Sequence, residues 1–131
     1  MNADTQQALA AIIGGVGAQA LNQGQIATIS GDGAIDVSVN GPDTIKLTKG
    51  SAAAITIAAP PTGSGGLRRT IISDSAFAHV ITFTGNTLRG GTAAVATATA
   101  AAQKGAGLTV VSLQPDEAAW GVVANVAMTL A

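Results

Sequence analysis

The chain contains very few side chains that could carry out chemistry. Among its 131 residues it has one histidine and no cysteine or tyrosine. His79 stands in an alternating run with Ile81 and Phe83, so its side chain is expected on the same face as theirs. A catalytic base needs a positioned nucleophile and an orienting group. No motif supplies them, since Gly63-Ser64-Gly65 lacks the spacing of a nucleophile elbow. We therefore predict that His79 is a hydrogen-bonded structural residue and that the chain has no catalytic residues.

The carboxylates do not form a recognisable site in the sequence. Most of them occupy predicted turns, where an Asp side chain bonds to nearby backbone. They are Asp4, Asp32, Asp36, Asp43, Asp74, Asp116 and Glu117. A calcium loop would need alternating ligands and a final Glu, and a zinc site would need more His or Cys. The sequence thus predicts no metal and no cofactor. It leaves open a pair of carboxylates that meet only in space.

Charged residues are scarce and nearly balanced. Six Lys and Arg against seven Asp and Glu give a net charge of −1, and charged residues make up 10% of the chain. Ordinary domains have about 25%. No basic stripe is available to follow a phosphate backbone, so nucleic-acid binding is disfavoured. The apolar stretch over 8–16 is too short to span a bilayer, so no membrane partner is expected. The adjacent pair Arg68 and Arg69 fits either a solvated loop edge or a contact with an acidic patch on a partner.

Apolar residues alternate with Thr, Lys or Ser along several short segments after residue 24. Such alternation, bounded by Gly, Pro and Asn, is typical of strands with one buried face. It is clearest over 44–48, 54–59, 79–84 and 107–112. Turns recur every eight to twelve residues, which predicts about eight to ten short strands in an antiparallel β-sandwich or barrel. The chain therefore divides into an N-terminal arm or short helix over 1–24 and a mainly β domain over 25–131.

Three segments carry more specific predictions. Residues 44–59 are predicted to form a hairpin around Lys49-Gly50. Residues 93–102 are rich in Ala and suit either a helix or a strand; their partial alternation favours a strand. Residues 120–130 are predicted to form the final strand. The side chains expected on its buried face are Trp120, Val122, Ala124, Val126 and Met128.

The N-terminal segment 1–24 differs in pattern from the rest. Its apolar residues Leu9, Ile12, Ile13 and Val16 fall at helical spacing, but interspersed glycines weaken a helix by up to about 1 kcal/mol each. One interpretation is an arm that orders against another protein and contributes these residues to partner binding. The alternative is a terminal helix that packs on the same domain.

Small side chains dominate the apolar composition. Hydrophobic residues make up 47% of the chain, but many are Ala, and the aromatic residues are limited to Phe77, Phe83 and Trp120. Each small side chain buries little area, at about 25 cal/mol per Å². We expect Trp120 to be structural, and we expect several copies to associate because association supplies further burial.

The order of the strands and the residue pattern within them resemble those of small β proteins of tailed bacteriophages. The segments that carry this resemblance are 53–60, the Gly-rich loop after it, 70–73, 78–83, 104–111 and 120–123, so it covers roughly residues 44–126. Such chains occur as capsid decoration (cement) proteins and in head or tail fibres. The resemblance implies a non-enzymatic structural virion protein, assembled in the host cytoplasm. It would bind the major capsid protein on the outer surface of the head as a homotrimer.

Two other functions remain open from the sequence. A fibre or spike module would bind a host receptor or glycan, and sugar sites usually need exposed aromatic platforms, which three aromatic residues supply poorly. An enzyme such as a polysaccharide depolymerase is disfavoured by the shortage of His, Glu and Tyr.

Overall fold

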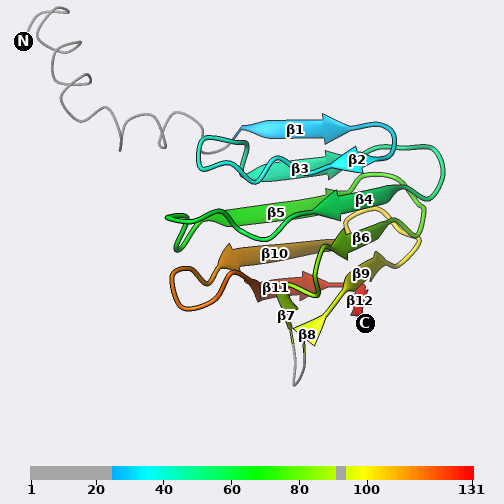
Figure 1. Ribbon diagram of the computed structural model, residues 1–131. Helices are drawn as coiled ribbons and strands as arrows, with labels where there is room; N and C mark the ends of the chain where they lie inside the picture. The colour runs from blue at the N-terminus through cyan, green and yellow to red at the C-terminus, as the bar shows by residue number, and fades with distance from the viewer. Residues whose placement is uncertain (1–24, 91–93) are drawn as a thin grey trace, which may run out of the picture.

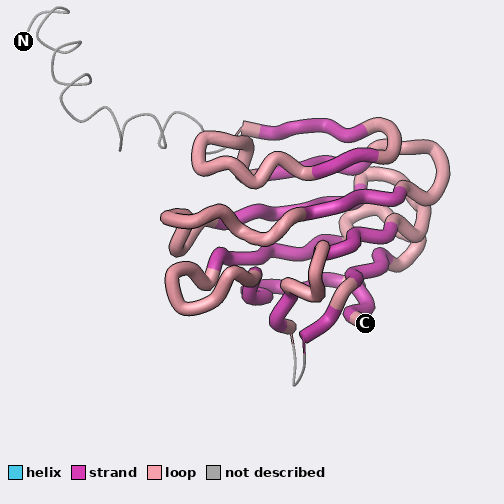
Figure 2. Tube along the Cα trace, in the orientation of Figure 1, coloured by secondary structure: helices cyan, strands magenta, loops and turns pink. Residues whose placement is uncertain are grey.

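The computed structural model describes residues 25–90 and 94–131. Every regular element in these ranges is a strand, and the strands form two sheets that enclose one hydrophobic core (Figures 1 and 2). The predicted mainly β fold is therefore confirmed. The arm or helix predicted over 1–24 lies outside the described residues.

Seven strands form the first sheet and five form the second. The first sheet has the order β1 (Ile26–Ile29), β3 (Thr44–Leu47), β5 (Arg68–Ser73), β10 (Gly107–Ser112), β11 (Trp120–Val126), β7 (Leu88–Arg89) and β8 (Ala94–Val95). The second has the order β12 (Met128–Leu130), β9 (Thr97–Ala100), β6 (Val80–Phe83), β4 (Ala54–Ile57) and β2 (Gly33–Ala34). Strands β8 and β9 confirm the strand assignment within 93–102.

The N-terminal half is a short parallel solenoid. Strands β1, β3 and β5 pair in parallel in the first sheet, and β2, β4 and β6 pair in parallel in the second. The chain alternates between the sheets, so it makes three coils, which we number coil 1 (26–34), coil 2 (44–57) and coil 3 (68–83). Strands β10 and β11 then extend the first sheet, and β9 and β12 extend the second, by antiparallel pairing.

The parallel coils correct two predictions about strand direction. The sheets are mixed rather than wholly antiparallel, and Lys49-Gly50 lies at a corner between the sheets instead of in a hairpin. Alternation indicates which face of a strand is buried but not which way its neighbour runs. A two-residue type I′ hairpin turn needs positive φ at both positions, and neither Lys49 nor Gly50 is among the described residues with positive φ.

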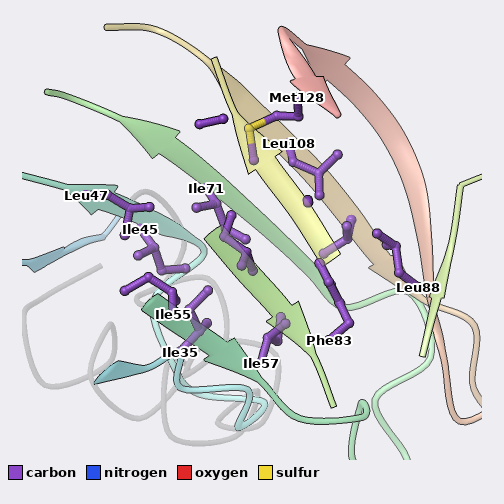
Figure 3. Close-up of a cluster of buried hydrophobic side chains, with 14 of the residues drawn as sticks. Ile35, Ile45, Leu47, Ile55, Ile57, Ile71, Phe83, Leu88, Leu108 and Met128 are labelled. Carbon is purple, nitrogen blue, oxygen red and sulfur yellow. The ribbon is translucent and has the colours of Figure 1, made fainter. Parts of the chain in front are cut away.

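Stacked isoleucines fill the space between the coils. The register aligns Ile45 with Ile71 in the first sheet and Ile55 with Ile81 in the second, and all four are buried. Figure 3 shows Ile45, Ile55 and Ile71 in one buried cluster with Phe83 and Leu108, and Ile81 belongs to the same cluster. Large aliphatic side chains thus build the core, although alanine dominates the apolar composition.

The predicted final strand over 120–130 is two strands in different sheets. A bulge at Val123 of β11, opposite the step from Thr109 to Val110 of β10, reverses the alternation, and Ala127 has a φ of 55° before β12 begins. Of the five side chains predicted to be buried, Trp120 and Met128 are buried and Val122 is half-buried. The other two, Ala124 and Val126, are exposed.

Trp120 anchors the end of β11 in the core, as the sequence predicts. Its side chain is fully buried, and its indole Nε1–H donates a 2.8 Å hydrogen bond to the backbone oxygen of Ala58, just beyond β4. The ring therefore links the antiparallel half of the fold to coil 2.

We expect the Trp120→Ala variant to lose about 3–5 kcal/mol of unfolding free energy, because it leaves a large cavity and an unpaired carbonyl. Phe77→Ala is the matched control: Phe77 is 39% exposed, so its truncation is expected to cost less than about 1 kcal/mol. Urea unfolding followed by circular dichroism measures both. Equal midpoints for the two variants would contradict the role assigned to Trp120.

Candidate functional site

His79 lies buried at the corner before β6, where both of its ring nitrogens are hydrogen-bonded. The Ala53 N–H donates to Nδ1 over 3.0 Å, and Nε2 lies 2.7 Å from the Ser75 hydroxyl oxygen. Ser75 donates its own proton to the backbone oxygen of Lys49 at 2.8 Å. Nε2 must therefore carry the proton that it gives to Ser75, and the ring is neutral. Burial, with a smaller contribution from the charge of Lys49, lowers the pKa of His79.

The Ser75 and His79 pair has the spacing of a nucleophile and its base but the wrong tautomer. To accept a proton from Ser75, Nε2 would have to be bare and Nδ1 protonated, yet Nδ1 faces the Ala53 N–H donor. Both side chains are buried. The arrangement fits the structural histidine predicted from the sequence, which here ties coil 3 to the corner of coil 2.

Three of the described carboxylates each pair with a different basic side chain. The hydrogen bond from Lys49 Nζ, 2.8 Å long, lowers the pKa of Asp32, and a second bond from the Ala54 N–H at 2.9 Å adds to this. Asp74 lies 3.7 Å from Lys46 Nζ. Glu117 accepts a 3.0 Å bond from the Nε of Arg89. Within the described ranges, no three His, Asp or Glu side chains come together as metal ligands.

The structure separates the two arginines that the sequence proposes for partner binding. Arg68 is exposed, whereas Arg69 is fully buried. Arg69 Nε donates to the backbone oxygen of Asp36 at 2.9 Å, and Nη2 donates to that of Ser38. Arg69 is thus corrected from a partner-binding residue to one that holds the loop after β2. The sequence does indicate this burial, because Arg69 stands two residues before the buried Ile71 in the same strand and therefore faces the same side of the sheet.

Two carboxylates partly compensate the positive charge of the buried Arg69. Burial lowers the pKa of the guanidinium, and Asp36 and Asp43 oppose that shift. The loop approaches so closely that a Cβ on Gly41 would lie 2.9 Å from Cγ of Asp36 and 3.0 Å from Nη2 of Arg69. A larger residue at position 41 would therefore displace the Asp36 carboxylate or the Arg69 guanidinium.

The most distinctive surface of the protein is the outward side of strands β1, β3, β5, β10 and β11, which we call the outer face. The register places its side chains in two rows across the five strands. One row is Ile26, Thr44, Thr70, Thr109 and Ala124, and the other is Thr28, Lys46, Ile72, Gly107 and Val126. Lys46 is the single charged residue in the two rows.

Large apolar side chains gather on this face. Of the five exposed large hydrophobic residues in the described chain, Ile26, Ile72 and Val126 lie in the rows, and Val123 is in the same strand as Val126. Ile26 is 62% exposed and Val126 is 58% exposed. Gly107 lies between Ile72 and Val126, and its missing side chain contributes to a shallow hollow that they line. The outward side of the second sheet carries mainly Ala and Thr instead.

The other predicted partner-binding residues, Leu9, Ile12, Ile13 and Val16, lie outside the described residues. The sequence did not single out the outer face, because the alternation that marks it was interpreted only for its buried side. In the part of the chain that the structure describes, no helix is long and apolar enough to cross a membrane. No protein-family model and no curated protein sequence matches the chain.

The adjacent arginines provide a matched test of the buried guanidinium. We expect Arg69→Ala to lower the unfolding free energy by about 2–4 kcal/mol, because the carbonyls of Asp36 and Ser38 lose a charged donor inside the protein. Arg68→Ala should change it by less than about 0.5 kcal/mol. Urea titrations compare the two, and similar losses would show that Arg69 does not hold the loop.

His79 predicts a pH dependence of stability. Its folded pKa is below the unfolded value of about 6.5, so its full contribution is present above that pH and is lost as the pH falls through the folded pKa. We expect the unfolding free energy to fall between about pH 7.5 and 5. The fall should be smaller in His79→Gln, which removes the titrating group.

Urea unfolding at the two pH values measures this difference. The lowered pKa values of Asp32 and Asp36 act below about pH 4 and do not interfere. An equal fall in the parent and in His79→Gln would rule out His79 as its source.

Proposed function

We propose that this protein is a non-enzymatic structural virion protein. In this proposal it is a capsid decoration or cement protein that binds the outer surface of a tailed-phage head as a homotrimer and stabilises it. The observation that carries the proposal is the outer face, which no described residue covers, which has Lys46 and Arg68 as its charged residues, and which exposes Ile26, Ile72 and Val126. Exposed apolar patches of this kind mark protein interaction sites.

The size of the outer face supports binding by several copies together. Five strands spaced about 4.8 Å apart, each with about four residues of 3.3 Å, give a face of roughly 20 Å by 13 Å. A stable interface usually buries about 800 Å² on each partner, which is more than this. One copy would therefore bind weakly, while three linked copies would gain avidity on a repetitive shell.

The solenoid gives the outer face a rigid support. Its strands are paired along the sheet from β1 through β11, and stacked isoleucines back them from inside. Four other outward positions are Thr, and the charged residues on this side are Lys46 and Arg68, so few charges would need to be desolvated on contact with another protein. A stiff, flat and weakly charged surface suits a clamp across neighbouring capsid subunits.

The aromatic residues favour this function over glycan recognition by a fibre. Trp120 and Phe83 are both buried, which leaves Phe77 as the one aromatic ring exposed in the described chain. A sugar platform needs exposed rings with polar groups beside them. The Ser75 and His79 geometry described above likewise gives no support to an enzyme.

Charge placed among the apolar side chains of the outer face should weaken attachment to the head. We expect Val126→Lys and Ile72→Lys to weaken binding by about tenfold or more, because the ammonium would be desolvated at the interface. Thr82→Lys is the matched control, because Thr82 is an exposed strand residue on the outward side of the second sheet.

Cosedimentation of the purified protein with empty heads of the phage that encodes it measures this binding. Unchanged binding of Val126→Lys would exclude the outer face as the docking surface. Binding of the parent to host cells but not to heads would favour the fibre function instead.

The proposed trimer makes a prediction for the protein in solution. Three chains of 12.7 kDa give 3 × 12.7, or about 38 kDa, by light scattering after gel filtration. The exposed apolar side chains provide the physical reason, since association would remove some of them from water. A monomer at all concentrations would contradict the trimer.

A further inference from the structure

The two ends of the solenoid are finished differently. At the C-terminal end, Leu130 of β12 packs so closely on the first sheet that a Cβ on Gly90 would lie 2.5 Å from it. Ala131 also accepts hydrogen bonds from Ala96 and Thr97. At the other end, β1 and β2 are the outermost strands of the two sheets (Figure 1). Among the described residues, nothing pairs with the outer edge of either strand.

Inward-facing positions of the first sheet are less buried in coil 1 than in the following coils. The register stacks Ala27 on Ile45 and Ile71, and Ile29 on Leu47. Ile45, Leu47 and Ile71 are each 1% exposed, whereas Ala27 and Ile29 are only half-buried. These positions are equivalent except that coil 1 is terminal. The lower burial of Ala27 and Ile29 therefore reflects the lack of a further layer against coil 1 among the described residues.

The second sheet shows the same change. Gly33 stacks on Ile55 and Ile81, which are buried, but Gly33 itself is exposed. Gly33 and Ala27 are also the smallest residues of their stacks. Coil 1 therefore presents small side chains at the position where the next layer would add apolar volume.

The edge strand β1 lacks the sequence features that usually protect a free strand edge. Its sequence, Ile26–Ile29, contains no charge, proline or bulge. The carbonyls of Gln25 and Ile29 bond toward β3, so in a parallel pair the backbone groups of Ile26 and Thr28 point to the free edge. Solenoids need a terminal cap with a polar outer side at such an end.

We propose that residues 1–24 of the same chain form this cap, with Leu9, Ile12, Ile13 and Val16 packed on coil 1. This segment joins β1 through Gln25, so it leaves the body at the open end itself. At the helical spacing of the sequence, Leu9 to Val16 spans about 10 Å, which matches the distance between two packed sheets. The eight residues between Val16 and Gln25 are long enough to reach across the end.

Attachment to coil 1 favours the chain's own end over a sister subunit or a capsid shell. A tethered segment has an effective concentration in the millimolar range, which a separate partner must exceed. The proposal therefore assigns the segment to the solenoid and leaves the outer face for other proteins. Its test does not depend on binding to phage heads.

The test compares hydrogen exchange of the β1 amides in full-length chains. In the double variant Ile12→Asp and Ile13→Asp, we expect these amides to exchange about tenfold faster or more than in the parent, because the cap no longer packs. The matched control Gln6→Asp with Gln7→Asp places the same charge in the same segment outside the apolar set. Amides of β9, in the second sheet, provide the internal reference.

Three outcomes decide the proposal. Faster exchange confined to β1 in the Ile12 and Ile13 variant supports it. Equal exchange in this variant and the parent overturns it. The third outcome comes from a mixing experiment, in which the isotope-labelled variant is refolded together with an excess of unlabelled parent. Recovery of β1 protection in the labelled chains would overturn closure by the same chain and assign the cap to a sister subunit.

Discussion

The fold depends on keeping three parallel coils in register, because a slip of one residue would turn every inward isoleucine to the surface. The backbone ladders set the spacing, and a few polar side chains fix the corners. Asp32 connects the first corner to Lys49 and Ala54, and His79 connects the third coil to Ala53. Arg69 reaches back from the third coil to the loop after the first. The charged and titratable side chains that could have carried out chemistry are thus used to hold one coil against the next.

This use of polar groups explains why function moves to a surface. The described buried polar side chains satisfy one another or the backbone, and none of their buried nitrogen or oxygen atoms lacks a partner. The interior therefore offers no unpaired group to a substrate. What remains for recognition is the outward side of the first sheet, where the regular ladder repeats Thr, Ile and Val at fixed spacing. The same coiled backbone therefore gives the protein both its rigid interior and its regular surface of Thr, Ile and Val.

The sequence predicts the strands of this protein better than their arrangement. Alternation located most of the strands, and strand parity places His79 and Trp120 correctly in the core. It could not show that β3 and β4 belong to different sheets, because the pattern is the same for a corner and for a hairpin. Strand parity also marks Arg69 as buried, but a charged residue was expected to seek solvent. The bulge at Val123 has no signature in the residues themselves, since it arises from the pairing of two strands.

The corner between coils 2 and 3 has a different length from the one before it. Thr44 follows its stacked partner Ile26 by 44 − 26 = 18 residues, whereas Thr70 follows Thr44 by 70 − 44 = 26. The ladder is unchanged, and the register divides the eight extra residues equally: Thr44 to Ile55 is 11 residues against 7 from Ile26 to Gly33, and Ile55 to Thr70 is 15 against 11 from Gly33 to Thr44. The second four fall in the loop around Gly63, where the backbone has a φ of 81° and no atom lies within 4 Å of a Cβ built there. This corner can therefore accept foreign sequence. A peptide inserted at Gly63 would be displayed on the body without disturbing the coils beneath it.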